Sequence, residues 1–268
     1  MSKLTITLDT EAFAYPSVPI PPVYTVRQKV EAPVLGNIES AAREAVGRLF
    51  SDPRLTKGAT VAVGVGSRGL ENLSTIVRAA VAELRRRGTC PFVVPAMGSH
   101  GGATADGQAS ILRDYGVSEE TTGAPVRPTM EVVELSRLED GYPVLFDRNA
   151  NAADAVIVVN RIKRHTCFHG RIESGLAKML AIGLGKHKGA LAIHQHGFTG
   201  LRDTMPRVAR SIIAHANVVG GIGILENAYG HTAEIHGLTA DEIGMDREAE
   251  LLERSRELSP RLAFDEAD

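Results

Sequence analysis

The sequence is poor in the features that mark several large classes of protein. It has no tryptophan, only 4% aromatic residues, and two cysteines in 268 residues. So few rings disfavour a surface that stacks on bases or sugars, and two cysteines cannot build a disulfide framework. The longest apolar runs fall far short of the roughly 20 residues that span a bilayer. A net charge of −2 excludes the overall basic field that is typical of nucleic-acid binding.

What remains is an ordinary globular composition, with 43% apolar and 23% charged residues. The length suffices for one large domain or two small ones with a buried core. The first ten residues, MSKLTITLDT, lack the apolar region of a secretory signal. We therefore expect a cytoplasmic protein that binds no nucleic acid and no membrane. The composition is compatible with a homo-oligomer.

The first 57 residues differ in pattern from the rest of the chain. They contain an alternating segment, Leu4–Leu8, typical of a half-buried strand, then a proline-rich linker, Pro16–Pro22, and a helical pattern over Ile38–Phe50. We expect this region to pack on a main domain, 58–268, in which strand and helix patterns alternate. That alternation predicts an α/β fold with an open, largely parallel sheet flanked by helices.

Hydrophobic periodicity sets the expected elements of the main domain. The predicted strands are Thr60–Val65, Cys90–Pro95, Glu131–Leu135, Pro143–Phe146, Ala155–Asn160 and Val218–Leu225. The predicted helices are Glu71–Arg87, Thr104–Tyr115, Ser174–Leu184, Asp203–His215 and Thr239–Leu258. The final residues, 262–268, read as the approach to another strand, so we expect one domain of a longer protein.

A glycine motif, GVGSRG at 64–69, lies between a predicted strand and a predicted helix. This G-x-G-x-x-G pattern is suited to binding a dinucleotide pyrophosphate through backbone N–H groups. Dinucleotide binding also needs an acidic residue at the end of the second strand, and the segment 93–97 has none. Two interpretations stay open: a plain tight turn, or a carboxylate or phosphate site made by Ser67, Arg68 and the helix N-terminus.

Two further loops follow predicted strands and carry histidines. The loop 97–104 holds His100 among glycines, and the loop 163–170 holds His165 and His169 beside two basic residues. Ligands of open α/β sheets bind at the carboxyl ends of the strands. His100 is therefore a candidate general base, unless it braces its own turn.

Lys178 lies on an otherwise apolar predicted helix, one turn after Ser174, so both side chains face the same side. Such a lysine either extends its amine to water or serves as a desolvated nucleophile that forms a covalent adduct. The glycine-rich loop 183–189 follows, and its Lys186 is suited to binding a phosphate or carboxylate.

The segment His194-Gln195-His196 places two histidines one residue apart. On a strand both imidazoles face one side and suit a metal ion, whereas on a helix they point apart. Because we expect a helix followed by a loop here, at most one of the two is a metal ligand.

Five motifs, in this order, resemble the nickel-dependent lactate racemase family over most of the chain, from about residue 58 onward. They are GSRG (66–69), GSHGGAT (98–104), KRHTCFHG (163–170), ESGLAKM (173–179) and GLGKHKGA (183–190). The resemblance implies an isomerase, a racemase or epimerase of a 2-hydroxy acid. It implies a nickel pincer nucleotide, which is a nicotinate-derived mononucleotide whose sulfur and carbon atoms bind nickel. It also implies a C-terminal domain, and we expect the present chain to correspond to the N-terminal, cofactor-bearing domain.

The resemblance implies where the cofactor is held. Lys178 tethers it through a thioamide, and Ser174 and Gly175 precede the lysine as the family pattern requires. The nickel ligand falls on His194, with His196 as the alternative. Ser67 and Lys186, in the two anion-binding loops, are further candidate cofactor contacts.

The resemblance also implies the residues that face the substrate. His100 and His165 are opposed acid and base groups, with His169 as the alternative to His165, and Arg68 binds the substrate carboxylate. The chemistry gives an independent reason for two histidines, because a flat keto acid formed by hydride transfer must exchange a proton from either side. Val65 stands where the lactate enzyme has an aspartate, which favours another 2-hydroxy acid.

Two alternatives remain at this point. One is a zinc hydrolase that uses His165, His169 and His194 as metal ligands, with Glu173 as a further one. The other is a catalytically incomplete domain that binds a ligand at the Ser67–Arg68 loop without turnover.

Overall fold

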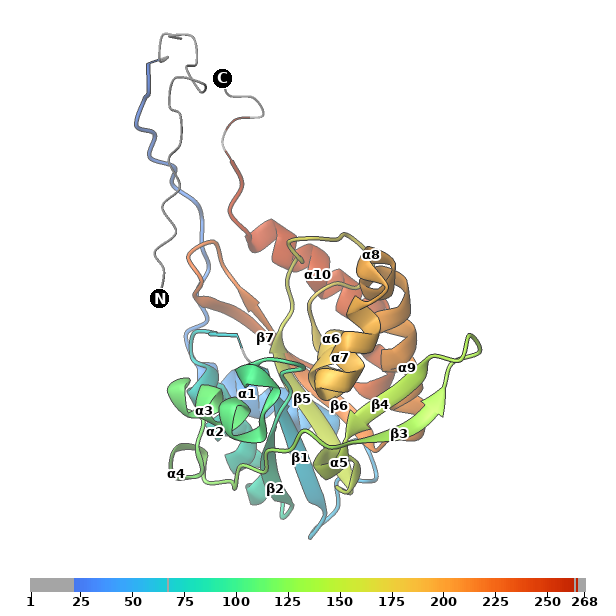
Figure 1. The fold of residues 1–268 in the computed structure, drawn as a ribbon. Helices are drawn as coiled ribbons and strands as arrows, with labels where there is room; N and C mark the ends of the chain where they lie inside the picture. Colours follow the sequence, from blue (N-terminus) through green and yellow to red (C-terminus); the bar gives the residue numbers. More distant parts are fainter. Residues whose placement is uncertain (1–21, 67, 263, 265–268) are drawn as a thin grey trace, which may run out of the picture.

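The computed structural model describes residues 22–66, 68–262 and 264, and a five-stranded sheet lies at its centre (Figure 1). The strands are β1 (Thr60–Val65), β2 (Cys90–Pro95), β5 (Ala155–Arg161), β6 (Val218–Glu226) and β7 (Thr232–Thr239). Their order is β2-β1-β5-β6-β7, and all neighbours are parallel except β6 and β7. The predicted fold class, an open and largely parallel sheet with flanking helices, is confirmed.

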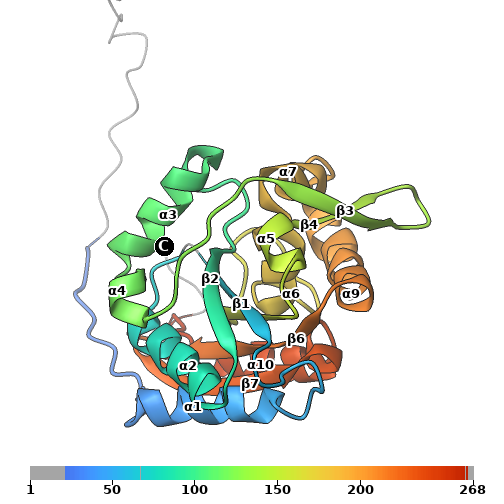
Figure 2. The ribbon, with the colours of Figure 1, turned by 90° about the horizontal axis from the view of Figure 1, so that it is seen from below.

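Helices cover both faces of the sheet, so the central strands are buried on both sides (Figure 2). This explains why β1 and β5 are continuous apolar runs rather than alternating patterns. On one face lie α1 (Ile38–Leu49) and α2 (Leu73–Arg86), and on the other α6 (Leu176–Lys178), α7 (Lys186–His194), α9 (Met205–His215) and α10 (Asp246–Leu258). The remaining helices are α3 (Ala105–Asp114), α4 (Glu119–Thr122), α5 (Arg148–Asn151) and α8 (Gly197–Thr199).

Two of the predicted strands do not join the central sheet. Instead β3 (Val132–Arg137) and β4 (Pro143–Asp147) pair with each other as an antiparallel hairpin. The connection between them is too short for the crossover that parallel neighbours require. The hairpin packs beside α7 and α9, and its last residue, Asp147, reaches the interior of the molecule.

The predicted helix Thr239–Leu258 begins too early. Thr239 is the last residue of β7, a strand that periodicity did not predict, and a short 3₁₀ turn, Ala240–Glu242, follows it. Gly244 then adopts a left-handed conformation (φ 74°), so α10 begins only at Asp246. A glycine in that conformation interrupts a helix that the charged sequence otherwise favours.

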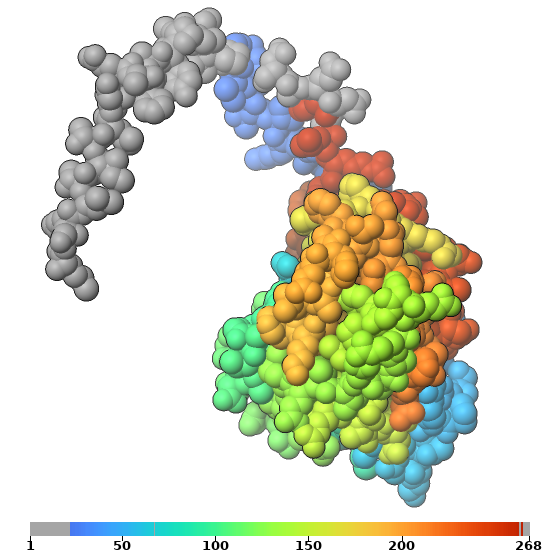
Figure 3. Space-filling model, turned by 45° about the vertical axis from the view of Figure 1, so that its right-hand side comes forward, coloured from blue at the N-terminus to red at the C-terminus, as the bar shows by residue number. Residues whose placement is uncertain are grey.

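The N-terminal region contributes α1, which packs against α2 and β7. The predicted strand Leu4–Leu8 and nearly all of Pro16–Pro22 lie outside the described residues, as do most of residues 262–268. Residues 22–32 extend away from the body of the molecule (Figure 3), and the chain joins it where Asn227 Nδ2 donates to Pro33 O and Leu35 N donates to Thr232 O. In the part of the chain that the structure describes, no helix combines the length and apolarity needed to cross a membrane.

Candidate active site

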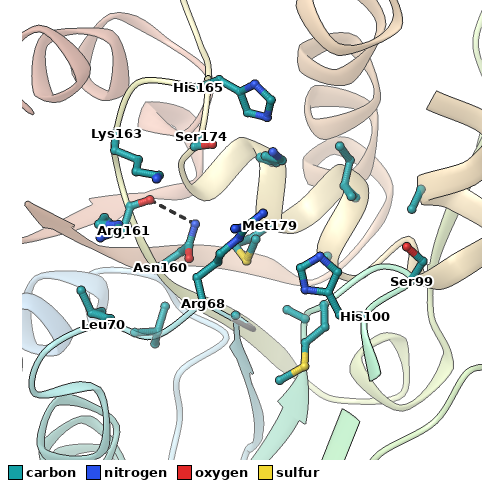
Figure 4. Close-up of a pocket in the computed structure, with 18 of the residues that line it drawn as sticks. Arg68, Leu70, Ser99, His100, Asn160, Arg161, Lys163, His165, Ser174 and Met179 are labelled. Carbon is teal, nitrogen blue, oxygen red and sulfur yellow. Dashed lines mark hydrogen bonds between the residues drawn. The ribbon is translucent and has the colours of Figure 1, made fainter. Parts of the chain in front are cut away.

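A cavity of about 280 Å³ opens at the carboxyl ends of β1, β2 and β5 (Figure 4). This is the place where open parallel sheets bind ligands. Segments far apart in sequence supply its polar lining: Arg68 after β1, Ser99 and His100 after β2, Asn160 to His165 at the end of β5, Ser174 and Lys178 around α6, and His194 at the end of α7. Six residues predicted from the sequence therefore share one cavity: Arg68, His100, His165, Ser174, Lys178 and His194.

Lys178 is the most buried charged group among the cavity residues. Burial, together with the nearby positive charges of Arg68 and Lys163, lowers the pKa of its amine to about 8. A pKa of about 8 leaves a useful fraction of neutral, nucleophilic amine near neutral pH. Lys178 is the last residue of α6, and a π-helical turn, Met179–Gly183, follows where one continuous α-helix was predicted. Such turns occur frequently at functional sites.

A buried carboxylate fixes the start of the Lys178 helix. Glu248 of α10 accepts hydrogen bonds from the backbone N–H groups of Leu176 and Ala177 and from that of Gly244. A carboxylate at a helix N-terminus satisfies free donors and is favoured by the helix dipole. Gly175 makes the contact feasible, because a Cβ atom there would lie 2.1 Å from Glu248 Oε1. No sequence signal linked Glu248 to this site.

Gly175→Ala is expected to lower the free energy of unfolding by about 2–4 kcal/mol, since the added methyl group displaces a buried carboxylate from two N–H donors. Urea unfolding measures the effect. Gly189→Ala is the matched control, because a Cβ there lies 3.5 Å from its nearest neighbour, Ala181 O. Equal effects of the two substitutions would contradict the steric role given to Gly175.

His165 lies on the loop after β5, and a fully buried carboxylate holds its backbone. Glu173 Oε2 accepts a hydrogen bond from His165 N (2.6 Å), and Glu173 also pairs with Arg256 (2.8 Å). Burial lowers the pKa of His165 to about 4, and the charge of Lys178 contributes in the same direction. The imidazole Nδ1 accepts a hydrogen bond from Cys167 N (3.2 Å), so the neutral ring carries its proton on Nε2.

His100 lies at the rim of the cavity, on the loop between β2 and α3. Partial burial lowers its pKa, and the charges of Arg68 and Lys178 lower it further. Figure 4 shows His100 and His165 at separate positions around the cavity. Because the pKa of each imidazole is lowered from its ordinary value of 6.5, both rings are neutral near pH 7.

Cations dominate the cavity. Arg68, Arg161, Lys163, Arg164 and Lys178 line it, and no carboxylate does so among the described residues. Arg161 is neutralised by an ion pair with Glu226 behind the wall, whereas no carboxylate pairs with Arg68 or Lys163 in the described part of the chain. The cavity therefore suits an anionic ligand. Asn160 and Arg161 also line the cavity, and although neither was a predicted site residue, their place at the end of a predicted strand was a usable signal.

Two of the predicted alternatives, His169 and His196, lie outside the cavity. Ser67 is outside the described residues. His169, with 67% of its side chain exposed, faces Glu173 outside the cavity, and His196 is exposed beside Tyr142. Since 186–194 is helical, His194 and His196 point apart as expected, and His194 is the one that lines the cavity.

Lys186 requires a correction, because its side chain is fully buried and ion-paired with Asp147. It lies in the protein core, where it cannot contact a bound phosphate. The glycines around it serve close packing: a Cβ at Gly183 would lie 2.8 Å from Ala96 O. Gly175, also predicted to contact the cofactor, is likewise buried and makes room for Glu248.

The described residues do not bring together the ligand set of the zinc alternative. They contain no group of three or more His, Cys, Asp or Glu side chains able to hold a metal ion. His169 faces away from the cavity that His165 and His194 share. A metal at His194 would need its other ligands from a bound group.

Comparisons with known proteins bear on the fold. No protein-family model matches the sequence, and no curated protein matches it. Among solved structures, the apoprotein of lactate racemase from Thermoanaerobacterium thermosaccharolyticum has a similar fold, with a TM-score of 0.57 and 13% identity over 82% of this chain. The chain spans 56% of the length of that protein. The similarity supports an α/β fold of this type and, at this identity, no more than the fold.

Proposed function

We propose that the chain is the cofactor-bearing part of a racemase or epimerase that acts on a 2-hydroxy acid. One observation carries the proposal: a desolvated lysine amine shares a single cavity, at the carboxyl ends of parallel strands, with His100, His165 and His194. The fold similarity to a lactate racemase apoprotein is consistent with it.

The residues present fit a nickel pincer nucleotide. When bound, this group would accept and return the hydride that no side chain can supply. Lys178 offers a partly neutral amine for the tether, and His194 offers an imidazole of the kind that nickel accepts. Within the described residues, Arg68 and Lys163 have no carboxylate partner and no carboxylate lines the cavity, so their charges suit a phosphate and a substrate carboxylate.

The chain's own residues would orient the substrate and move its proton. Arg68 binds the carboxylate and fixes the hydroxyl-bearing carbon between the two histidines. His100 would accept the hydroxyl proton as the carbonyl forms on one side, and His165 would do so on the other once its ring proton has moved from Nε2 to Nδ1.

The decisive experiment uses the whole protein purified from its own organism. Intact and peptide mass spectrometry with metal analysis should find an adduct on Lys178 and bound nickel. Chiral chromatography should show inversion of at least one 2-hydroxy acid in a panel that includes lactate. An unmodified Lys178, or binding of the acids without inversion, would overturn the proposal, and the second result would favour a ligand-binding domain.

Arg68→Met should raise KM for the acid by about 10–100-fold, because a charge-assisted hydrogen bond to a carboxylate contributes roughly 1.5–3 kcal/mol. The kcat should change less. Arg164→Met is the matched control, since Arg164 is likewise an exposed cation lining the cavity and the proposal assigns it no contact with the substrate. Steady-state kinetics in both directions would test this, and equal changes in KM for the two variants would remove Arg68 from substrate binding.

A further inference from the structure

A buried ion pair lies behind the loop that carries His100. The side chains of Lys186 and Asp147 are both fully buried, and Lys186 Nζ lies 2.9 Å from Asp147 Oδ2. The ammonium also donates to the carbonyl of Pro95, the last residue of β2, and to Gln108 Oε1 (3.2 Å). An ion pair removed from water is rarely more stable than apolar packing of similar volume. Its presence here therefore points to a role in specifying local geometry.

Gln108, on α3, connects the pair to the loop. Since an ammonium only donates hydrogen bonds, the Oε1 atom of Gln108 must face Lys186, and the NH₂ group must face away. That NH₂ group donates to Gly98 O (2.9 Å) and to His100 O (3.3 Å). The reversed amide would place an oxygen against two carbonyl oxygens. The charge of Lys186 thus selects the orientation of Gln108 that binds the loop.

The loop depends on such contacts because its backbone is irregular. Gly98, Gly101, Gly102 and Ala103 all have φ between 55° and 65°, a region that costs a non-glycine residue about 1–2 kcal/mol. Lys186 itself has φ 54°. Gly98 N also donates to Gly183 O (3.0 Å), which joins the loop to the π-helical turn after Lys178.

We propose that Lys186, Asp147 and Gln108 form a positioning network that holds the His100 loop at the cavity. The network rests on the proposed function only for the role of His100 in proton transfer. None of its three side chains lines the cavity, so each acts through the loop backbone. Lys186, which the sequence suggested as a phosphate ligand, is thereby given a positioning role.

The first test is Gln108→Leu, which removes both donors at similar volume. NMR titration of the histidine rings in the protein without ligands should show the His100 pKa rising toward its ordinary value, because the ring moves away from Arg68, Lys178 and its partly buried position. The His165 pKa should not change, since that ring lies on another loop. Ser110→Ala, on the same helix, is the control. A general loss of structure would shift both histidines.

The second test removes the ion pair without leaving a lone buried charge. Lys186→Met/Asp147→Asn retains volume, and the asparagine oxygen still caps α5 through Ala150 N. We expect the same rise in the His100 pKa and, in active enzyme, a fall in kcat of about 10–100-fold with little change in KM. If both variants fold and His100 titrates as in the wild type, the network is rejected. A His100 shift in a protein that inverts no 2-hydroxy acid would instead reject only the proposed function.

Discussion

Lys178→Met should reduce stereoinversion by more than about 1,000-fold, because the hydride acceptor is lost together with its tether. The mass adduct should disappear, and nickel content should fall with it. Lys163→Met is the matched control: it removes another cavity amine, and with it one charge that suits the phosphate, but it leaves the covalent tether, so the adduct on Lys178 and its nickel should persist. An adduct that persists in Lys178→Met, or moves to Lys163, would place the tether elsewhere. Intact mass and metal analysis of the paired variants decide between these results.

The same substitution should change the titration of His165. The charge of Lys178 is, after burial, the largest cause of the low pKa of that imidazole, about 4. Removing the charge should raise the His165 pKa toward 6.5, which NMR titration measures directly. Acylation of the amine by a cofactor would also abolish the charge, so the loaded protein should titrate like Lys178→Met. An unshifted His165 would mean that the two groups do not interact.

The low pKa of Lys178 also leads to a prediction about stability that can be tested without the cofactor. Its pKa is about 8 in the folded protein against an ordinary 10.5, so between these values the unfolded chain binds more protons. The stability of the wild type relative to Lys178→Met should therefore rise from pH 8 to 10.5, by about 1–3 kcal/mol. Below pH 8 the buried charge should leave the wild type the less stable of the two. Urea unfolding at several pH values measures this difference in the free energy of unfolding. A difference that does not change with pH would mean that the amine is not desolvated.

The sequence predicted the convergence of the site because a parallel sheet imposes it. The strands β1, β2 and β5 were each evident in the sequence as apolar runs. The carboxyl ends of parallel strands meet at one edge of the sheet. Arg68, His100 and His165 follow those strand ends, so their proximity required no knowledge of side-chain packing. Lys178 and His194 were assigned to the same site from the family resemblance and from the helical pattern.

What sequence reasoning missed depends on burial and on contacts distant along the chain. Lys186 lies between glycines in a pattern that favours an anion-binding loop, yet packing turns it inward to Asp147, which lies 39 positions earlier. Glu248 reads as one more charge on an exposed helix, although its carboxylate binds the start of α6. β7 was overlooked because an antiparallel edge strand with polar residues lacks the continuous apolar run of the central strands.

The role of His165 poses the sharpest chemical question, because its Nδ1 accepts a hydrogen bond from Cys167 N. In that state Nε2 carries the proton and only donates. To act as a base, the ring must give up this 3.2 Å contact and move its proton to Nδ1. The contact is long enough that its loss should cost little, roughly 1 kcal/mol.

The substitution His165→Gln distinguishes a role in hydrogen-bond donation from a role in proton transfer. The glutamine amide can supply an N–H donor near the position of Nε2 but cannot exchange a proton, so inversion should fall by about 10²–10⁴-fold, as in His165→Ala. His100→Gln should have a loss of the same order, because each direction of inversion uses both groups. Initial rates from each enantiomer, with intact mass confirming the loaded cofactor, provide the measurement. If His165→Gln keeps most of the activity while His165→Ala does not, His165 is a hydrogen-bond donor and proton transfer rests on His100 alone.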